Sequence, residues 1–530
     1  MTRNDYDVAI IGYGPVGATA ANLLGIRGLR VLVVERDTDI YSRARAISTD
    51  EEIIRIWQRI GLSETLKADM LGERDTEFVG LNGRAFARVK PEPAGHGHPP
   101  QLFIYQPAVE QTLRDGAARF PNVEVRLGRE AVRQVQDGDG VEVAVLNPET
   151  DTVDRVRVAY VIAADGGSSP TRGQLGISFE GRTYEDRWIV IDTKVTKAWP
   201  EVDFLRFHCN PDRPAVDCPT PLGHHRWEFP VLDGDDETYL TSPEGVRELL
   251  AGQGIGTDQV EVLRAVVYSH HVRFAAKWRM GRIFLAGDAA HVMPPWIGQG
   301  MASGVRDAAN LCWKLAAVLD GTLPESVLDS YEVERQPNVR RITGAAIRVG
   351  HIITERRHWL ARLRDPLMRG ALGTPGLRDV VKRTSWVPYP RYRDGLLARV
   401  SARGSDATGW QVPQPWVLAP DGRRVRLDDV TGATWTVLTV AGSGHERSVR
   451  QWRDLGVPVL TVTPPGSPTS ASSVVDIDGM LLAWLGERSA CAVALRPDGF
   501  IYTAAAKGQQ LAEPPLLASP RQTSILEETA

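Results

Sequence analysis

The stretch that decides the fold is Asp7-Val8-Ala9-Ile10-Ile11-Gly12-Tyr13-Gly14-Pro15-Val16-Gly17, which precedes a second apolar run, Val31-Leu32-Val33-Val34-Glu35. The pattern predicts a buried strand, a tight glycine turn into a helix, and a second strand. Glycines at this spacing are typical of the turn that holds a dinucleotide pyrophosphate at a helix N-terminus. The alternative is that they serve only helix packing. We expect an ADP moiety here, with the binding residues Gly12, Gly14, Pro15, Val16 and Gly17.

An acidic residue ends the second predicted strand. Glu35 lies about 20 residues beyond the glycines, where a carboxylate binds ribose hydroxyls. Such a carboxylate disfavours a 2′-phosphate, so FAD or NAD is a better candidate than NADP for the tightly held ligand. Arg36 follows directly, as a cofactor contact or as an exposed cation.

Length and composition narrow the class of protein. The chain has 530 residues, 42% of them apolar and 24% charged, with a formal net charge of −4. Several domains are expected, with no electrostatic case for nucleic acid. No signal-type segment or membrane-length apolar run is present, so we expect a cytoplasmic protein without a membrane contact. Four scattered cysteines without a C-x-x-C pair predict neither a disulfide framework nor a metal site.

Two later apolar strands are also expected to end at the nucleotide site. Tyr160–Ala164 runs into Asp165-Gly166, and Arg282–Ala286 runs into Gly287-Asp288. A long helix is predicted for 299–319. The core sheet therefore has parts that lie far apart in the sequence.

Patterns of alternating residues predict further sheets. Residues 123–125, 141–146 and 153–158 are expected to form a meander, and 188–195, 225–231 and 262–268 are expected to be strands of an inserted antiparallel domain. Near the C-terminus a strand, a helix, a strand and a hairpin follow in thioredoxin-like order. Ala441-Gly442-Ser443-Gly444-His445 stands where the redox dithiol would be, so no thiol chemistry is expected.

The predicted fold is therefore α/β. It combines a Rossmann-like FAD-binding domain, an inserted antiparallel β-sheet substrate domain and a C-terminal thioredoxin-like domain. The expected boundaries are 1–74, 106–186 and 275–394 for the three parts of the FAD-binding domain and its helical region, 75–105 and 187–274 for the substrate domain, and 395–530 for the thioredoxin-like domain that lacks C-x-x-C.

Three separated motifs together resemble the single-component (class A) FAD-dependent aromatic hydroxylases, the para-hydroxybenzoate hydroxylase fold. These motifs are the N-terminal glycines, Asp165-Gly166, and Gly287-Asp288-Ala289-Ala290-His291 followed by Pro294-Pro295-Trp296-Ile297-Gly298-Gln299-Gly300-Met301. The run from Gly298 to Lys314 is most similar to 3-(3-hydroxyphenyl)propionate hydroxylases. The resemblance covers about residues 5–345 well and the C-terminal domain more weakly.

The resemblance implies FAD and assigns roles to further residues. Asp288 would accept a hydrogen bond from a ribityl hydroxyl; the alternative is a carboxylate that only caps the next turn. Backbone N–H groups at the start of the long helix would stabilise charge on the N1–C2=O edge of reduced flavin. The implied cofactor contacts are Arg45, Gln106, Asp165, Gly166, Gly287, Asp288, Pro295, Gly298, Gln299, Gly300 and Met301. His291 is expected to hold backbone rather than to transfer a proton.

No side chain can be assigned a catalytic role, and the substrate contacts are candidates only. For Trp227 and Tyr268 the alternative is the core of the sheet, and for Arg226 it is exposure to solvent. The candidates are Trp296, Pro295, Arg226, Trp227, His225 and Tyr268.

The function that the resemblance implies is hydroxylation of a phenolic aromatic compound. NADPH or NADH would reduce FAD as a transient reductant, and O₂ as co-substrate would form a flavin C4a-hydroperoxide that transfers oxygen to the ring. The alternatives are a tailoring oxygenase for a polyketide-type natural product, a non-oxygenating flavin reductase and a non-catalytic nucleotide-binding protein. The expected partner is a small aromatic substrate, with a homodimer as a further expectation.

Overall fold

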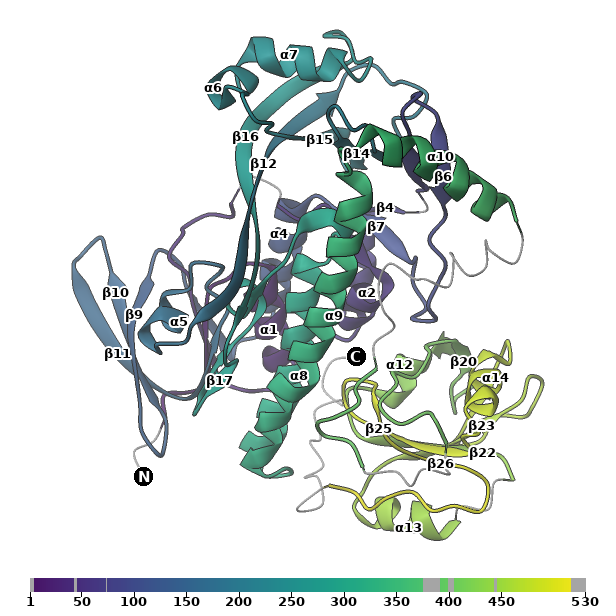
Figure 1. Ribbon diagram of the computed structural model, residues 1–530. Helices are drawn as coiled ribbons and strands as arrows, with labels where there is room; N and C mark the ends of the chain where they lie inside the picture. Colours follow the sequence, from purple (N-terminus) through teal and green to yellow (C-terminus); the bar gives the residue numbers. More distant parts are fainter. Residues whose placement is uncertain are drawn as a thin grey trace.

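The protein was analysed as a computed structural model that describes residues 4–41, 45–72, 74–374, 391–398, 405–442 and 446–515. Figure 1 shows a central α/β body, a large twisted β-sheet above it and a separate C-terminal body at the lower right. Among the described helices, none combines the length and apolarity needed to cross a bilayer.

A mostly parallel sheet forms the centre of the molecule. Its strands follow the order β17-β18-β11-β1-β2-β8, and the pairs from β18 to β8 are parallel. All four residues of β2 are buried, as expected for a strand covered on both faces. Helix α1 packs on β1 and β2, and helices α4 and α8 pack against α1. The bounds are β1 (Tyr6–Ile11), β2 (Val31–Val34), β8 (Val123–Arg126), β11 (Thr152–Ala163), β17 (Arg279–Met280), β18 (Ile283–Leu285), α1 (Pro15–Gly25), α4 (Gln106–Ala117) and α8 (Gly300–Leu319).

The predicted meander is only partly correct. Strand β8 pairs in parallel with β2, and the antiparallel meander consists of β9 (Glu130–Gln136), β10 (Val141–Asn147) and β11. β11 is one long strand whose first half pairs with β10 and whose second half pairs with β1. A short alternating strand carries no sign of which neighbour it will pair with, so the error could not be seen in the sequence.

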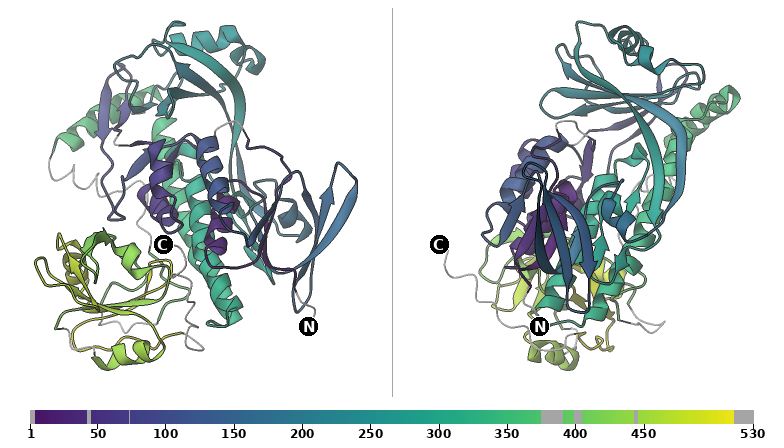
Figure 2. Two further views of the ribbon diagram at one scale, coloured as in Figure 1. Left: turned by 180° about the vertical axis from the view of Figure 1, so that it is seen from behind. Right: turned by 90° about the vertical axis from the view of Figure 1, so that its left-hand side faces the viewer.

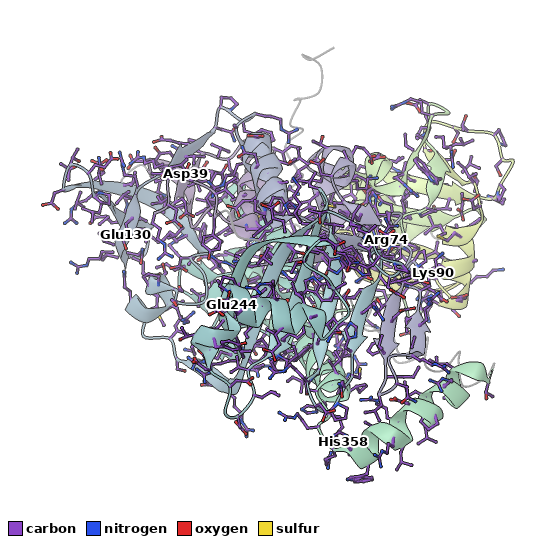
Figure 3. The ribbon with its side chains drawn as sticks, turned by 90° about the horizontal axis from the view of Figure 1, so that it is seen from above. Asp39, Arg74, Lys90, Glu130, Glu244 and His358 are labelled. Carbon is purple, nitrogen blue, oxygen red and sulfur yellow. The ribbon has the colours of Figure 1, made fainter. Side chains whose placement is uncertain are left out.

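The second large sheet has the order β19-β16-β12-β15-β14-β13-β5-β6. Neighbouring strands are antiparallel except for the parallel pair of β13 and β5. Two short helices, α6 and α7, cover its outer face (Figure 2). In the view from above, Glu244 marks α7 on this outer side (Figure 3). The bounds are β5 (Thr76–Val79), β6 (Ala85–Val89), β12 (Phe179–Val195), β13 (Leu205–His208), β14 (Ala215–Thr220), β15 (His224–Pro230), β16 (Val260–Ala275), β19 (His291–Val292), α6 (Glu237–Leu240) and α7 (Pro243–Ala251).

Shorter elements connect the two sheets. A three-stranded sheet has the order β3-β7-β4, and long helices α8 and α9 run through the centre of the view in Figure 1. The bounds are β3 (Ser48–Asp50), β4 (Leu71–Gly72), β7 (Gln101–Phe103), α2 (Glu51–Gln58), α3 (Ser63–Ala68), α5 (Pro170–Gln174), α9 (Ser330–Ile353), α10 (His358–Gly373), and the 3₁₀ turns η1 (Gly287–Ala289), η2 (Pro295–Ile297) and η3 (Glu325–Asp329).

The C-terminal body is a seven-stranded sheet of order β21-β20-β24-β23-β22-β25-β26. The expected strand, helix, strand and hairpin correspond to β22, α13, β23 and β25–β26. The thioredoxin-like assignment stays a prediction, and residues 443–445 of the loop at the dithiol position lie outside the described residues. The bounds are β20 (Trp416–Leu418), β21 (Arg424–Arg426), α12 (Leu427–Thr431), β22 (Thr436–Val440), α13 (Glu446–Asp454), β23 (Val459–Thr463), β24 (Ser473–Asp476), α14 (Met480–Glu487), β25 (Ala492–Leu495) and β26 (Ile501–Ala505).

Candidate active site

The N-terminal glycines form a cradle at the start of α1. Gly12 has φ +97°, and a Cβ there would lie 2.4 Å from the carbonyl oxygen of Ala164. A Cβ on Gly17 would lie 2.0 Å from the carbonyl oxygen of Gly12, whereas one on Gly14 would meet nothing within 4 Å. Gly14 caps α1 without a side-chain hydrogen bond, so no capping side chain occupies the N–H groups of Val16 and Gly17 in the first turn. This arrangement fits a pyrophosphate.

Glu35 lies beside the cradle at the end of β2. One of its carboxylate oxygens accepts the N–H of Tyr13 at 2.6 Å, and the other accepts the N–H of Asp37 at 3.0 Å. Because a carboxylate has about four acceptor sites, two of them stay available for ribose hydroxyls. The side chain of Arg36 is exposed.

Asp165 has an acceptor atom without a protein partner. Its Oδ2 accepts the N–H of Thr171 at 3.0 Å. Its Oδ1 is buried, and within the described residues it has no hydrogen-bond partner. Gly166 follows with φ +83° and open space where a Cβ would be. Buried polar atoms are normally satisfied, so the free Oδ1 fits a site for polar groups of a cofactor.

Asp288 lies where β18 runs into η1. Its side chain is accessible to solvent, yet enough protein surrounds it that desolvation raises its pKa, against the charges of His291 and Arg45. Asp288 also directly follows Gly287, which packs against Val16 at the start of α1. The position suits a hydrogen bond to a cofactor hydroxyl.

Close backbone packing brings the predicted motifs together. A Cβ on Gly287 would lie 3.0 Å from Cγ2 of Val16, and one on Gly304 would lie 2.5 Å from the same methyl group. Helix α1, turn η1 and helix α8 therefore meet at one point, as the sequence predicts for motifs that share a ligand.

A buried ionic cluster holds the turn at Gly287. Asp307 of α8 accepts the N–H of Gly287 at 3.1 Å, lies 2.6 Å from Nε2 of His291, and accepts Nε of Arg335 at 2.8 Å. Burial would raise the pKa of Asp307, but His291 and Arg335 hold it below the usual range. His291 therefore contacts the carboxylate that accepts the Gly287 N–H, and a direct hold on backbone by His291 stays a prediction.

At the start of α8 the backbone N–H of Gly298 donates to the carbonyl of Pro295 at 2.8 Å, and the predicted contact of the following N–H groups with a flavin stays a prediction. Gly298 has φ +64°, and Gln299 caps the helix without a side-chain hydrogen bond to its backbone. The amide of Gln299 is instead used inside the protein, where it donates to Asp50 at 3.0 Å and accepts from Arg306 at 2.9 Å. Helix α8 itself begins with Gly300 and Met301, and Met301 packs against the core. The Gln299 side chain is therefore occupied within the protein, and a ligand would contact the backbone of this segment instead.

The backbone around Arg45 is held from two sides. Oε1 of Gln106 accepts the N–H groups of Arg45 and Ala46 at 3.0 and 2.7 Å, and Nη1 of Arg226 donates to the Arg45 carbonyl at 3.0 Å. The Arg45 guanidinium is exposed and lies over the ring of Tyr41. Gln106 thus shapes the loop that presents Arg45.

Alternating residues of β15 point to opposite faces of the large sheet. Arg226 faces the Arg45 loop and donates to Asp192 at 2.8 Å, and Asp192 also pairs with Arg264. His225 and Trp227 face the other way.

The outward-facing pair is fully buried. His225 pairs with Asp217 at 3.0 Å, and Trp227 packs in the apolar cluster beneath α7. The structure therefore gives His225 and Trp227 no surface toward the cofactor.

Tyr268 and Trp296 lie on the cofactor side. Tyr268 of β16 is 49% exposed, and burial together with the charge of Asp288 raises its pKa; Glu228 adds to this rise and Arg45 opposes it. Trp296 in η2 contacts Trp188 edge-on with ring centroids 4.9 Å apart, and Pro295 beside it is exposed.

Several residues of this region were missed in the sequence. Glu228 shares the face of Arg226, and the strand alternation could have identified it. Arg306 and Asp307 lie in the predicted helix, but no local pattern shows their partners. Arg306 pairs with Asp50, about 250 positions away, and Asp307 pairs with His291.

The comparisons with known proteins agree with this geometry. The family model described as FAD binding domain matches residues 5–346, and the HcaD C-terminal domain matches residues 409–515. A 3-(3-hydroxy-phenyl)propionate/3-hydroxycinnamic acid hydroxylase of Burkholderia cenocepacia is 35% identical, with 94% of each chain covered. The chain belongs to the FAD-dependent aromatic hydroxylases.

Solved structures of similar proteins cover almost the whole chain. The anhydrotetracycline hydroxylase OxyS of Streptomyces rimosus is 27% identical with a TM-score of 0.74, covering 95% of this chain and 96% of that one. The flavin-dependent monooxygenase PieE, solved in complex with FAD and substrate, is 24% identical with a TM-score of 0.78, and the coverage is 95% and 97%. Hydroxylases of this family use FAD, NADPH or NADH as a transient reductant, and O₂.

Proposed function

We propose that this flavin hydroxylase acts on a phenol with a short acidic side chain, between the cofactor cradle and the inner face of the large sheet. The observation that supports this most directly is the strand register, which places Tyr268 on the same face of the large sheet as Glu228. On the cofactor side, the charge of Asp288 contributes to the raised pKa of Tyr268. The relative from Burkholderia cenocepacia is named for a phenolic propionate, and its similarity covers 94% of this chain.

The proposed cofactor site uses the cradle and the three motif ends. Gly12, Gly14 and Gly17, with Pro15 and Val16 at the start of α1, would hold the pyrophosphate, and Glu35 the adenosine ribose. Asp165, Gly166, Gly287 and Asp288 would bind the ribityl chain, with Gln106 shaping the loop. The segment Gly298–Met301 would lie against the flavin ring, with the N–H groups of Gln299, Gly300 and Met301 as donors, because the Gly298 N–H donates to Pro295. When bound, FAD supplies hydride acceptance and oxygen activation.

On the substrate side, the protein must orient the ring and exclude water. Trp296 and Pro295 would line the ring slot. The raised pKa of Tyr268 keeps its hydroxyl protonated, so it can donate a hydrogen bond to the substrate oxygen. Arg226 and Arg45 are the cations of this region, and either could attract a carboxylate side chain.

The second candidate function is tailoring of a large polycyclic natural product. It is favoured by the likeness to the anhydrotetracycline hydroxylase over the whole chain. Substrate size separates the two functions.

The test is a panel of substrates with the purified FAD-loaded enzyme. We expect 3-(3-hydroxyphenyl)propionate and 3-hydroxycinnamate to stimulate NADH or NADPH oxidation with one hydroxylated product per reductant. Oxidation that yields only peroxide with these phenols, together with coupled turnover of a tetracyclic phenol, would favour the tailoring function instead.

We further propose a cytoplasmic location and a homodimer. All four cysteines are free thiols, which fits a reducing compartment. Light scattering after size-exclusion chromatography measures the oligomeric state.

A further inference from the structure

Glu228 is a desolvated carboxylate on the inner face of the large sheet. It lies two residues beyond Arg226, so the two side chains share the face that reaches the Arg45 loop. Its strand neighbours are Val190 of β12 and Val216 of β14. Val216 belongs to the apolar cluster against which Trp296 packs. Glu228 therefore lies on the side of the sheet that faces the proposed substrate site.

Within the described residues, the carboxylate of Glu228 has no polar partner. In the described part of the chain it makes no hydrogen bond and no ion pair, although its side chain is half-buried. Asp192, which shares this face of the sheet, differs because it pairs with both Arg226 and Arg264. A desolvated carboxylate without a hydrogen bond is costly, and such groups cluster at functional sites.

The charges around Glu228 come from three strands and the cofactor loop. Burial raises its pKa, Arg226 lowers it and Asp192 raises it. Tyr268 is close enough to interact with both Glu228 and Asp288, and Arg45 interacts with Tyr268 from the loop. A phenol placed beside the Tyr268 hydroxyl would therefore lie between the cofactor side and Glu228.

We propose that Glu228 is the base that accepts the proton of the substrate hydroxyl. This inference rests on the proposed function, because it requires a phenolic substrate. The O–H bond of the phenol breaks, the proton moves to a carboxylate oxygen of Glu228, and the electron pair stays on the phenol oxygen. That oxygen then donates electron density to the ring positions ortho and para to it. One of these carbons forms the new C–O bond with an oxygen atom derived from O₂ and releases its hydrogen as a proton, while NADH or NADPH supplies the two electrons that reduce the other oxygen atom to water. Tyr268 stays protonated and donates a hydrogen bond to the phenolate.

The matched variants are Glu228→Gln, Glu228→Asp and the control Glu261→Gln, which makes the same change at an exposed position of the same sheet. The probe is 3-(3-hydroxyphenyl)propionate with the FAD-loaded full chain. In Glu228→Gln we expect hydroxylation to fall by about 10²- to 10⁴-fold, the range for loss of a general base. FAD occupancy and substrate binding, followed by flavin absorbance, stay unchanged, and Glu228→Asp keeps part of the rate.

Two readouts separate proton transfer from a purely structural role. The raised pKa of Glu228 predicts that wild-type hydroxylation falls on acidification at a pH above the ordinary glutamate value of about 4.3, and that this limb disappears in Glu228→Gln. A ring-fluorinated analogue, whose hydroxyl ionises more readily, should recover much of the lost rate in Glu228→Gln only.

The outcomes are distinguishable. Wild-type hydroxylation with an equal rate in Glu228→Gln overturns the assignment of the base and leaves the proposed function standing. Loss of activity together with FAD or substrate binding, without recovery on the fluorinated phenol, assigns Glu228 a structural role and also overturns it. A wild-type enzyme inactive on every phenol overturns the proposed function, and the assignment of the base falls with it.

Discussion

Single side chains in the cofactor region differ in whether the protein already uses them. Glu35 and Gln106 accept backbone hydrogen bonds, and the Gln299 amide is bound on both sides. Asp288 is different, because its side chain is accessible to solvent although the surrounding protein raises its pKa. At the scale of the residue, Asp288 is therefore the side chain whose change should affect the cofactor most selectively.

Replacing Asp288 by alanine should weaken FAD binding by about 10- to 100-fold, because a hydrogen bond to a charged group contributes about 1.5–3 kcal/mol. Flavin fluorescence during titration of apoenzyme measures the affinity. Glu130→Ala, at an exposed position of β9 (Figure 3), is the control and should bind FAD normally. Full FAD affinity in Asp288→Ala would contradict the assigned contact.

At the scale of elements, a buried ionic cluster joins α2 to the start of α8. Arg306 donates to Asp50 at 2.6 Å, to Glu52 at 2.5 Å and to the Gln299 side chain. Burial opposes the charge on Asp50, yet Arg306 and Gln299 lower its pKa. Since Asp50 also caps α2, one cluster fixes two helix ends.

Replacing Arg306 by methionine should lower the free energy of unfolding by about 3–5 kcal/mol, because two buried carboxylates lose their cation. The double variant Arg306→Met/Glu52→Gln should lose less than the sum of the two single changes, since it buries one unpaired charge fewer. Urea unfolding followed by tryptophan fluorescence measures both. Additive losses would show that the cluster does not act as a unit.

At the scale of the whole molecule, the C-terminal body is joined to the FAD-binding body by buried charges. Arg496 donates to Glu334 of α9 at 2.8 and 2.9 Å, and Lys314 of α8 reaches the same carboxylate at 2.8 Å. At a second point, Asp428 of α12 pairs with Arg55 of α2 at 2.6 Å. Both bodies should therefore unfold in one transition.

Acidification should weaken the junction at Glu334. Burial favours the neutral acid, but Arg496 and Lys314 lower the pKa of Glu334 to about 2, below the unfolded value of about 4.3. The stabilisation is complete above the unfolded pKa and is lost as the pH falls through the folded one. The difference in melting temperature between wild type and Glu334→Gln should shrink between about pH 4.3 and 2. A constant difference over that range would refute the assignment.

Much of the cofactor region could be predicted because its signals are local. The positive φ of Gly12 and the packing of Gly17 follow from a turn that only glycine permits. The face of the large sheet that would meet the substrate was harder to predict. Alternation predicts that His225 and Trp227 share one face and Arg226 and Glu228 the other, but both faces are buried, so the pattern does not show which one meets the cofactor. Pairings such as Arg496 with Glu334 depend on how distant parts of the chain pack together, and no pattern in the sequence around either residue predicts them.

The backbone of Arg45 is held at both of its polar groups: its N–H donates to the side chain of Gln106 on α4, and its C=O accepts from the side chain of Arg226 on β15. A hydrogen bond weakens steeply as it lengthens or bends. A small tilt of the large sheet relative to α4 would therefore weaken at least one of these two hydrogen bonds. We therefore expect a ligand that shifts the large sheet relative to α4 to move the exposed Arg45 guanidinium as well.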